Sequence, residues 1–126
     1  MRQPQTILSV PYPFLTQSEV PEIIFENAVA EAIDDVFSVL GIENKQAIYR
    51  QLKNNCGINE NEIAYKIEDF ARAIDQIFGS GAKLIEIKIM ELLHAKFEDL
   101  SYIPKKGELN FVEFVYNLQR HLQSGT

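Results

Sequence analysis

Residues 66–79 read KIEDFARAIDQIFG, and this stretch carries the sharpest periodic signal in the chain. Its apolar side chains recur at helical spacing and fall in a stripe about 120° wide, at roughly 100° per residue. The stripe consists of Ile67, Phe70, Ala71, Ile74, Ile77 and Phe78. Gly79 ends the pattern, as glycine commonly does after a helix. The stretch therefore predicts an amphipathic helix that buries one face.

Two further helices are predicted upstream. The first begins near Ser18, carries apolar residues at helical spacing, and ends at Gly41. A shorter second helix begins at about Asn44, a suitable N-cap residue, and ends near Cys56. The polar residues 57–65 then lead to the third helix, and two apolar residues are expected to anchor this connection to the core. These anchors are Ile58 and Ile63.

A fourth helix is predicted from about Ser80 to Phe97, with Ser80 as its N-cap and Gly81 permitting a close corner after the third helix. Three apolar residues lie away from its main apolar face, and they are Leu84, Ile87 and Ala95. A helix that is apolar on more than one side is usually covered on more than one side. We therefore expect the C-terminal segment, a second copy or another protein to pack there.

The last helix is expected to begin after Asn110, whose side chain suits a capping box with Glu113. Its apolar residues recur at i, i+3, i+4 and i+7, and they are Phe111, Phe114, Val115 and Leu118. That spacing suits a helix that packs on its own core, and it also suits one that docks into a partner's groove. The core-facing interpretation is favoured because this period is so common in ordinary helices.

The segment before the first helix has a different character. Residues 1–18 contain Pro4, Pro11 and Pro13, which favour extended backbone and predict an arm without helix. The arm also carries apolar residues, including Tyr12 and Phe14, so we expect it to lie against the body of the protein or a partner.

The chain has 126 residues, which is the length of one domain. The prediction is a single all-α domain, a compact bundle of four to five helices. It consists of an extended proline-containing arm at 1–18, a helical core at 19–97, and a C-terminal turn and helix at 98–126.

Charge and hydropathy exclude several classes of partner. The net charge is −6, and the interval between Arg2 and Lys45 contains seven acidic residues and no basic one. An acidic surface repels phosphate backbones, so nucleic acid is not an expected partner. No apolar run approaches the roughly 20 residues that span a bilayer, and the start lacks the pattern of a signal peptide. We therefore expect no membrane association and a cytoplasmic location.

Residues 40–97 show a resemblance to a known family. Its most distinctive part is Ile77-Phe78-Gly79-Ser80-Gly81-Ala82, where one helix end leads directly into the next helix start. The other residues that carry it are Leu40-Gly41, Ala47-Ile48, Leu52, Gly57-Ile58, Ile63, Phe70, Ile74, Ile85-Glu86 and Ile89. The pattern resembles the Nitrosopumilus-type output domain, a small archaeal helical family found alone or attached to signalling proteins. The resemblance implies a regulatory or binding module, and it transfers no functional residue.

Glu91 and His94 have the Glu-x-x-His spacing of di-iron and di-manganese carboxylate bundles. Such a site needs a second copy of the motif and two further carboxylates, and His121 has no glutamate three residues before it. A solvated polar stripe is therefore the preferred interpretation, although a dimer offers one route to a metal site. We predict no catalytic residue and no cofactor.

Three other features have a structural interpretation that outweighs the functional one. The first helix has an acidic face formed by Glu26, Glu31, Asp34 and Asp35, which we expect to be solvated, with attraction of a basic partner as the second interpretation. The Gly79–Gly81 segment precedes a helix N-terminus that can hold an anion, but turn geometry accounts for its composition. Cys56, the only cysteine, excludes an intrachain disulfide and is expected to act as a small apolar residue.

These observations favour a non-catalytic protein-interaction or regulatory module that forms a homodimer. The side chains expected to dock are Leu84, Ile87, Phe111, Phe114, Leu118, Tyr12 and Phe14. The alternative is a metal-dependent enzyme with a site built across a dimer from Glu91 and His94.

Overall fold

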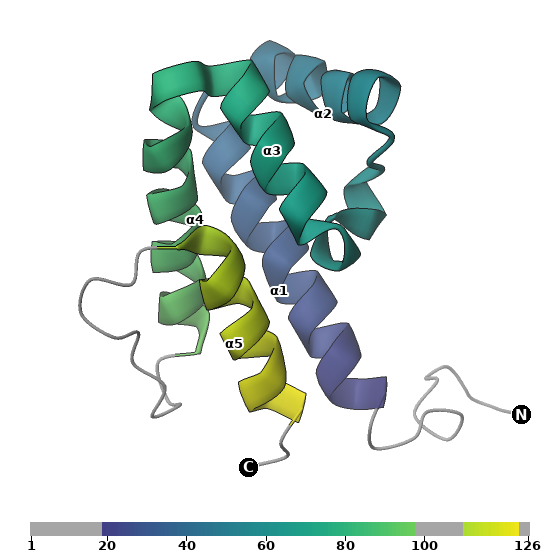
Figure 1. The fold of residues 1–126 in the computed structure, drawn as a ribbon, viewed down its shortest axis with the longest axis vertical. Coiled ribbons are helices and arrows are strands. Elements are labelled where there is room, and N and C mark those ends of the chain that lie inside the picture. The colour runs from purple at the N-terminus through teal and green to yellow at the C-terminus, as the bar shows by residue number, and fades with distance from the viewer. Residues whose placement is uncertain (1–18, 98–109, 124–126) are drawn as a thin grey trace, which may run out of the picture.

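The computed structural model describes residues 19–97 and 110–123, and all regular structure in this part of the chain is helical. Residues 19–97 and 110–123 contain five α-helices and two short 3₁₀ helices, and Figure 1 shows their arrangement. In chain order they are α1 (Glu19–Ser38), α2 (Ile42–Cys56), η2 (Glu60–Tyr65), α3 (Ile67–Phe78), η3 (Gly79–Gly81), α4 (Ala82–Lys96) and α5 (Phe111–Gln123). The predicted all-α bundle is confirmed, while the N-terminal arm lies outside the described residues.

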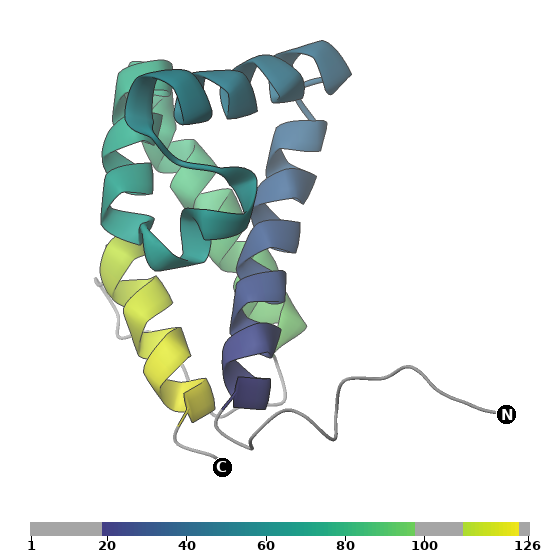
Figure 2. The same cartoon turned by 90° about the vertical axis from the view of Figure 1, so that its right-hand side faces the viewer.

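The helices are arranged around α1, which contacts α2, η2, α4 and α5. Helix α2 crosses the end of the molecule at which α1 finishes, and α3 and α5 lie one above the other (Figures 1 and 2). The turn η3 joins α3 to α4 at the same end as α2 (Figure 1). Both α2 and η2 contact α1, and together they form the walls of a groove.

A single apolar cluster holds these elements together. The ring of Phe70 in α3 lies 6.4 Å from that of Phe37 in α1 and 6.1 Å from that of Phe111 in α5. Burying a side chain of this size contributes about 1.5–3 kcal/mol relative to leaving it exposed. The predicted stripe of α3 is buried at Ile67, Phe70 and Ile74, and its remaining members are half-buried, whereas Ala73 is buried. The buried face is rotated towards Ala73 because α3 packs against α2, α4 and α5 together.

The start of α2 differs from the prediction. The helix begins at Ile42, after Gly41 with a φ of 100°, and Asn44 is not its N-cap. The Asn44 side chain instead donates a hydrogen bond from Nδ2 to the carbonyl oxygen of Leu40, at 2.7 Å. A positive φ is open to glycine at little cost, so the chain reverses at one residue and the helix starts two residues earlier.

The start of α4 also requires a correction. Residues Gly79–Gly81 form η3, and α4 begins at Ala82 without a side-chain cap, so Ser80 does not cap it. Gly79 has a φ of 57° and ends α3 as predicted. A Cβ on Gly81 would meet only the Cβ of Phe78 at 3.8 Å, an ordinary contact, so no close corner requires glycine there.

The connection at 57–65 is more ordered than its polar sequence indicates. It contains η2, whose capping box joins Asn59 and Glu62, and Lys66 donates hydrogen bonds to the carbonyl oxygen of Gly57 and to Glu62. Ile58 and Ile63 are buried, so their predicted role as anchors is confirmed. The predicted cap of the last helix is also present, because Asn110 Oδ1 accepts a hydrogen bond from the backbone of Glu113 at 3.0 Å.

Candidate interaction surface

A hollow with a volume of about 620 Å³ lies between α2 and η2. We refer to it as the α2–η2 groove. One side of α2 forms its main wall, with residues spaced by one helical turn, and Asp34 of α1 adjoins them. The lining residues from α2 are Ile42, Lys45, Gln46, Tyr49, Arg50 and Lys53, and those from the opposite wall are Asn59, Glu60 and Asn61.

Asp34 connects α1 to this wall. Tyr49 donates its hydroxyl to Asp34 Oδ1 at 3.0 Å, and Lys45 Nζ donates to Asp34 Oδ2 at 3.2 Å. The Tyr49 ring also packs edge-on against Phe37, with ring centroids 5.4 Å apart. Burial, together with the hydrogen bond to Asp34 and its charge, raises the pKa of Tyr49. Tyr49 is thus a protonated, positioned hydroxyl at neutral pH, and its role here is to bind α2 to α1.

The other two cations of the groove, unlike Lys45, do not bind a carboxylate of the described chain. Arg50 and Lys53 are exposed, and neither forms an ion pair or hydrogen bond with any residue that the structure describes. The amide side chains of Gln46 and Asn61 likewise bond to nothing within 19–97 and 110–123. The groove therefore presents charged and hydrogen-bonding groups that its own fold leaves available.

A smaller acidic hollow of about 300 Å³ adjoins the groove between α1 and η2. Its carboxylates are Glu31, Asp34, Asp35 and Glu60. Lysines of the same chain pair with two of them, since Lys96 Nζ lies 2.9 Å from Glu31 Oε1 and Lys45 binds Asp34. The acidic face that we expected to be solvated is thus partly neutralised by α2 and α4.

Exposed apolar side chains gather near the turn between α1 and α2. Val39 is 85% exposed and Ile42 is 62% exposed, and Ile42 also lines the groove. A second recess of about 300 Å³, lined in part by Leu40, Ile48 and Phe78, lies at the same corner. Local sequence patterns do not indicate this surface, because the residues flanking Gly41 are typical of helix ends.

The predicted docking residues differ in how exposed they are to solvent. Leu84 is 58% exposed, whereas Ile87 is half-buried against the core. Helix α5 packs on its own chain, and its stripe is buried at Phe111, Phe114 and Leu118. The core-facing interpretation of α5 is confirmed, so these three side chains are not available to a partner in the folded chain. Tyr12 and Phe14 lie outside the described residues.

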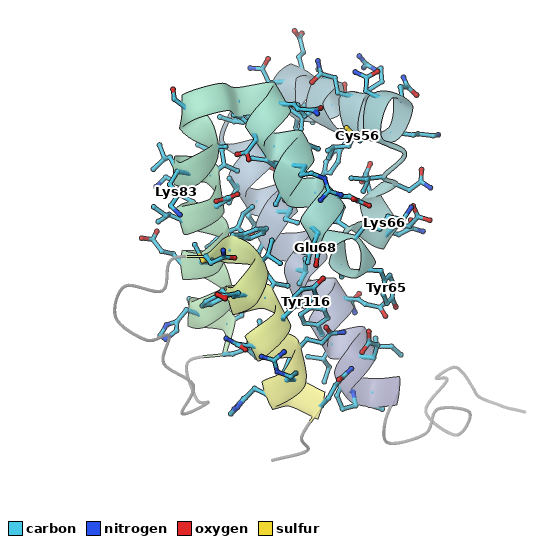
Figure 3. The ribbon with its side chains drawn as sticks, in the orientation of Figure 1. Cys56, Tyr65, Lys66, Glu68, Lys83 and Tyr116 are labelled. Carbon is cyan, nitrogen blue, oxygen red and sulfur yellow. The ribbon has the colours of Figure 1, made fainter. Side chains whose placement is uncertain are left out.

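Helix α5 is also held to α3 by a polar contact at the surface. Tyr116 donates its hydroxyl to Glu68 Oε2 at 3.0 Å (Figure 3). Desolvation raises the pKa of Tyr116, and the hydrogen bond to Glu68 raises it further. This contact resembles that of Tyr49 with Asp34, and it joins a different pair of helices.

Glu91 and His94, the ligands of the alternative metal site, are both exposed on α4. Glu91 and His94 are not joined by further ligands, since no cluster of three or more His, Cys, Asp or Glu side chains within the described ranges is placed to hold a metal ion. A site shared between two subunits stays a hypothesis, which elemental analysis of the purified protein tests. Cys56 is half-buried at the end of α2, beside Gly57 (Figure 3).

None of the described helices combines the length and apolar character needed to cross a bilayer. Comparison of the chain with known protein families, with curated proteins and with solved structures finds no match.

Proposed function

We propose that this chain is a non-catalytic protein-interaction module, and that it binds a partner through the α2–η2 groove together with Val39 and Ile42. We call this combined surface the corner face. The observation that carries the proposal is that Ile42 is 62% exposed where it lines the α2–η2 groove, a hollow of about 620 Å³. Single exposed apolar residues are common on protein surfaces and need no explanation. Exposed apolar side chains beside a groove with polar groups are typical of interaction sites.

The composition of the corner face supports this function. Protein interfaces combine an apolar centre with a polar rim, and tyrosine and arginine are enriched in them. The groove offers Ile42 and the Tyr49 ring as apolar surface, with Arg50 and two amide side chains around them. The Asp34 contacts hold the Tyr49 ring in place, which lowers the entropy that binding would cost.

A regulatory role, implied by the resemblance over residues 40–97, and self-association into a homodimer belong to the same proposal. Light scattering at several protein concentrations measures self-association directly. A dimer would use either the corner face or the surface around Leu84 on α4, which is exposed to nearly the same extent as Ile42.

Photo-crosslinking in the cells that make the protein tests the proposal. A benzophenone amino acid at position 42 is expected to give a discrete crosslinked protein species. The same group at position 84 provides a control of matched exposure, and position 88 provides a charged control on α4. Purified partner should then bind Ile42→Asp more weakly than the parent chain.

Two outcomes would contradict the corner face as the docking surface. Crosslinking at position 84 but not at 42 would transfer the function to α4. Equal crosslinking at positions 42, 84 and 88, or none at all three, would indicate that neither surface binds a specific partner.

A further inference from the structure

The α2–η2 groove carries two cations that are not paired with a carboxylate of the described chain. The chain carries more acidic than basic residues, and several of the described cations on its surface form an ion pair with a carboxylate. The paired ones are Lys45, Lys66, Arg72 and Lys96. Arg50 and Lys53 lack such partners within 19–97 and 110–123, although they line a hollow in an acidic protein.

From this arrangement we propose that the groove binds an extended acidic peptide segment of the partner. The inference rests on the proposed function and deepens it, because it states what the corner face recognises. Arg50 and Lys53 lie on the same side of α2, about one helical turn apart, so two carboxylates spaced along an extended chain can meet them. Arginine is well suited to this task because its guanidinium binds a carboxylate through two parallel hydrogen bonds.

The remaining lining residues suit a peptide main chain. Gln46 and Asn61 each offer both a donor and an acceptor, which an extended segment without a neighbouring strand requires. Ile42, at the other end of the α2 wall, provides an apolar contact for one side chain of the peptide. The volume of about 620 Å³ lies within the range of roughly 300–1,000 Å³ typical of ligand sites.

The neighbouring charges set the position of the peptide within the groove. Asp34 is already bound by Lys45 and Tyr49. The remaining repulsive groups are Glu60, on the η2 wall of the groove, and Asp35 of α1, in the adjoining acidic hollow. An acidic segment therefore lies along α2, with its carboxylates towards Arg50 and Lys53. A basic occupant would prefer the acidic hollow, but that hollow has about half the volume, and two of its carboxylates are paired with lysines.

Selection from a random peptide library displayed on phage, with the purified full chain as bait, tests this without assuming a partner. We expect a consensus with at least two acidic residues and one apolar residue. Synthetic peptides from the selection are then titrated by fluorescence anisotropy. The double variant Arg50→Glu/Lys53→Glu should lower their affinity by about tenfold or more, because rim charges contribute modestly one by one and reversal adds repulsion.

Lys88→Glu is the matched control, since it changes the net charge in the same direction at an exposed cation of α4 outside the groove. It should change the affinity by less than about twofold, because screening by salt weakens interactions between distant surface charges. Arg50→Gln provides a milder variant, and circular dichroism with thermal melting verifies that each variant folds.

The outcomes separate this inference from the proposed function. A neutral or basic consensus whose binding Ile42→Asp abolishes would overturn the acidic-peptide inference and leave the interaction module intact. A selection without any peptide that depends on Arg50 and Lys53 would overturn the inference, while crosslinking at position 42 decides the proposed function separately. If the parent chain forms a dimer that the double charge reversal dissociates, the occupant of the groove is a second copy of the chain. That outcome also overturns the acidic-peptide inference.

Discussion

At the scale of single residues, the contacts of Asp34 are the clearest case of a side chain with a defined task. Its two oxygens accept hydrogen bonds from Tyr49 and Lys45, both on α2. The bonds position the wall of the groove relative to α1. Tyr116 and Glu68 form a comparable pair between α5 and α3, and the hydroxyl–carboxylate distance is 3.0 Å in both cases.

The two tyrosines allow a matched comparison. Tyr49→Phe should lower the free energy of unfolding by about 1 kcal/mol or more, because a half-buried hydrogen bond to a charged group is lost. Tyr116→Phe should cost only a few tenths of a kcal/mol, since its contact is solvated. Urea unfolding followed by circular dichroism measures both. Equal losses would show that Tyr49 has no special role in joining α2 to α1.

The raised pKa of Tyr49 predicts a pH dependence of stability in the alkaline range. The unfolded chain loses the tyrosine proton at a pH of about 10, whereas the folded chain retains it to higher pH. The contribution of Tyr49 is therefore fully present below about pH 10 and is lost as the pH rises towards the folded-state pKa. The stability of the parent chain should fall more steeply above about pH 10 than that of Tyr49→Phe. Parallel slopes in urea titrations at increasing pH would refute this.

At the scale of elements, the turns determine how the helices meet. Because the chain turns at Gly41, α2 starts at Ile42, two residues before Asn44. Gly79 ends α3 with a backbone conformation of φ 57° and ψ −124°, which residues with a Cβ rarely adopt. Gly81, two residues further on, has an ordinary helical conformation. The segment between α3 and α4 therefore contains one glycine that the backbone needs and one that it does not.

Alanine at these two positions should have opposite effects. Gly79→Ala should destabilise the protein by about 1–2 kcal/mol, because the backbone conformation is strained for any residue with a Cβ. Gly81→Ala should be neutral or stabilising by up to about 1 kcal/mol, because it reduces the freedom of the unfolded chain without a clash. Thermal and urea unfolding measure both variants. A loss at Gly81→Ala as large as that at Gly79→Ala would contradict the described turn.

At the scale of the whole molecule, one core links all five helices, and of the corner face only Tyr49 packs against it. Phe70 lies at the centre of this core, between Phe37 and Phe111. Val39, in contrast, is almost fully exposed at the start of the turn to α2. Stability and binding should therefore respond to different substitutions.

Phe70→Ala should cost about 3–5 kcal/mol, because it removes a buried ring and leaves a cavity among three helices. Val39→Ala should stay within about 0.5 kcal/mol of the parent chain. Equilibrium unfolding in urea measures the free energy of unfolding of both variants, and the slope of the transition verifies that each folds cooperatively. A cost below about 1 kcal/mol for Phe70→Ala would show that α1, α3 and α5 do not share one core.

Much of the fold was predictable because helices are determined by local spacing. The stripe from Ile67 to Phe78 and the stop at Gly79 were identified from neighbouring residues alone, whereas α1 ends at Ser38, before the expected stop at Gly41. The exact start of α2 and of α4 was not, because a side chain suited to capping does not form a cap unless the backbone places it there. Asn44 and Ser80 illustrate this, because Asn44 lies within the first turn of α2, after Gly41, and Ser80 lies inside η3, after Gly79.

The sequence by itself determined the helical class, the buried stripes of α3 and α5, and the anchors Ile58 and Ile63, since each depends on periodicity within a few residues. Only the tertiary structure decided which polar groups are paired and which remain available. Lys96 reaches Glu31 across 65 positions of sequence, and Lys45 reaches Asp34 on another helix. Arg50 and Lys53 are available because α2 crosses the end of α1 with that side turned towards η2. The direction in which one helix crosses another depends on packing between distant segments, which no local pattern records.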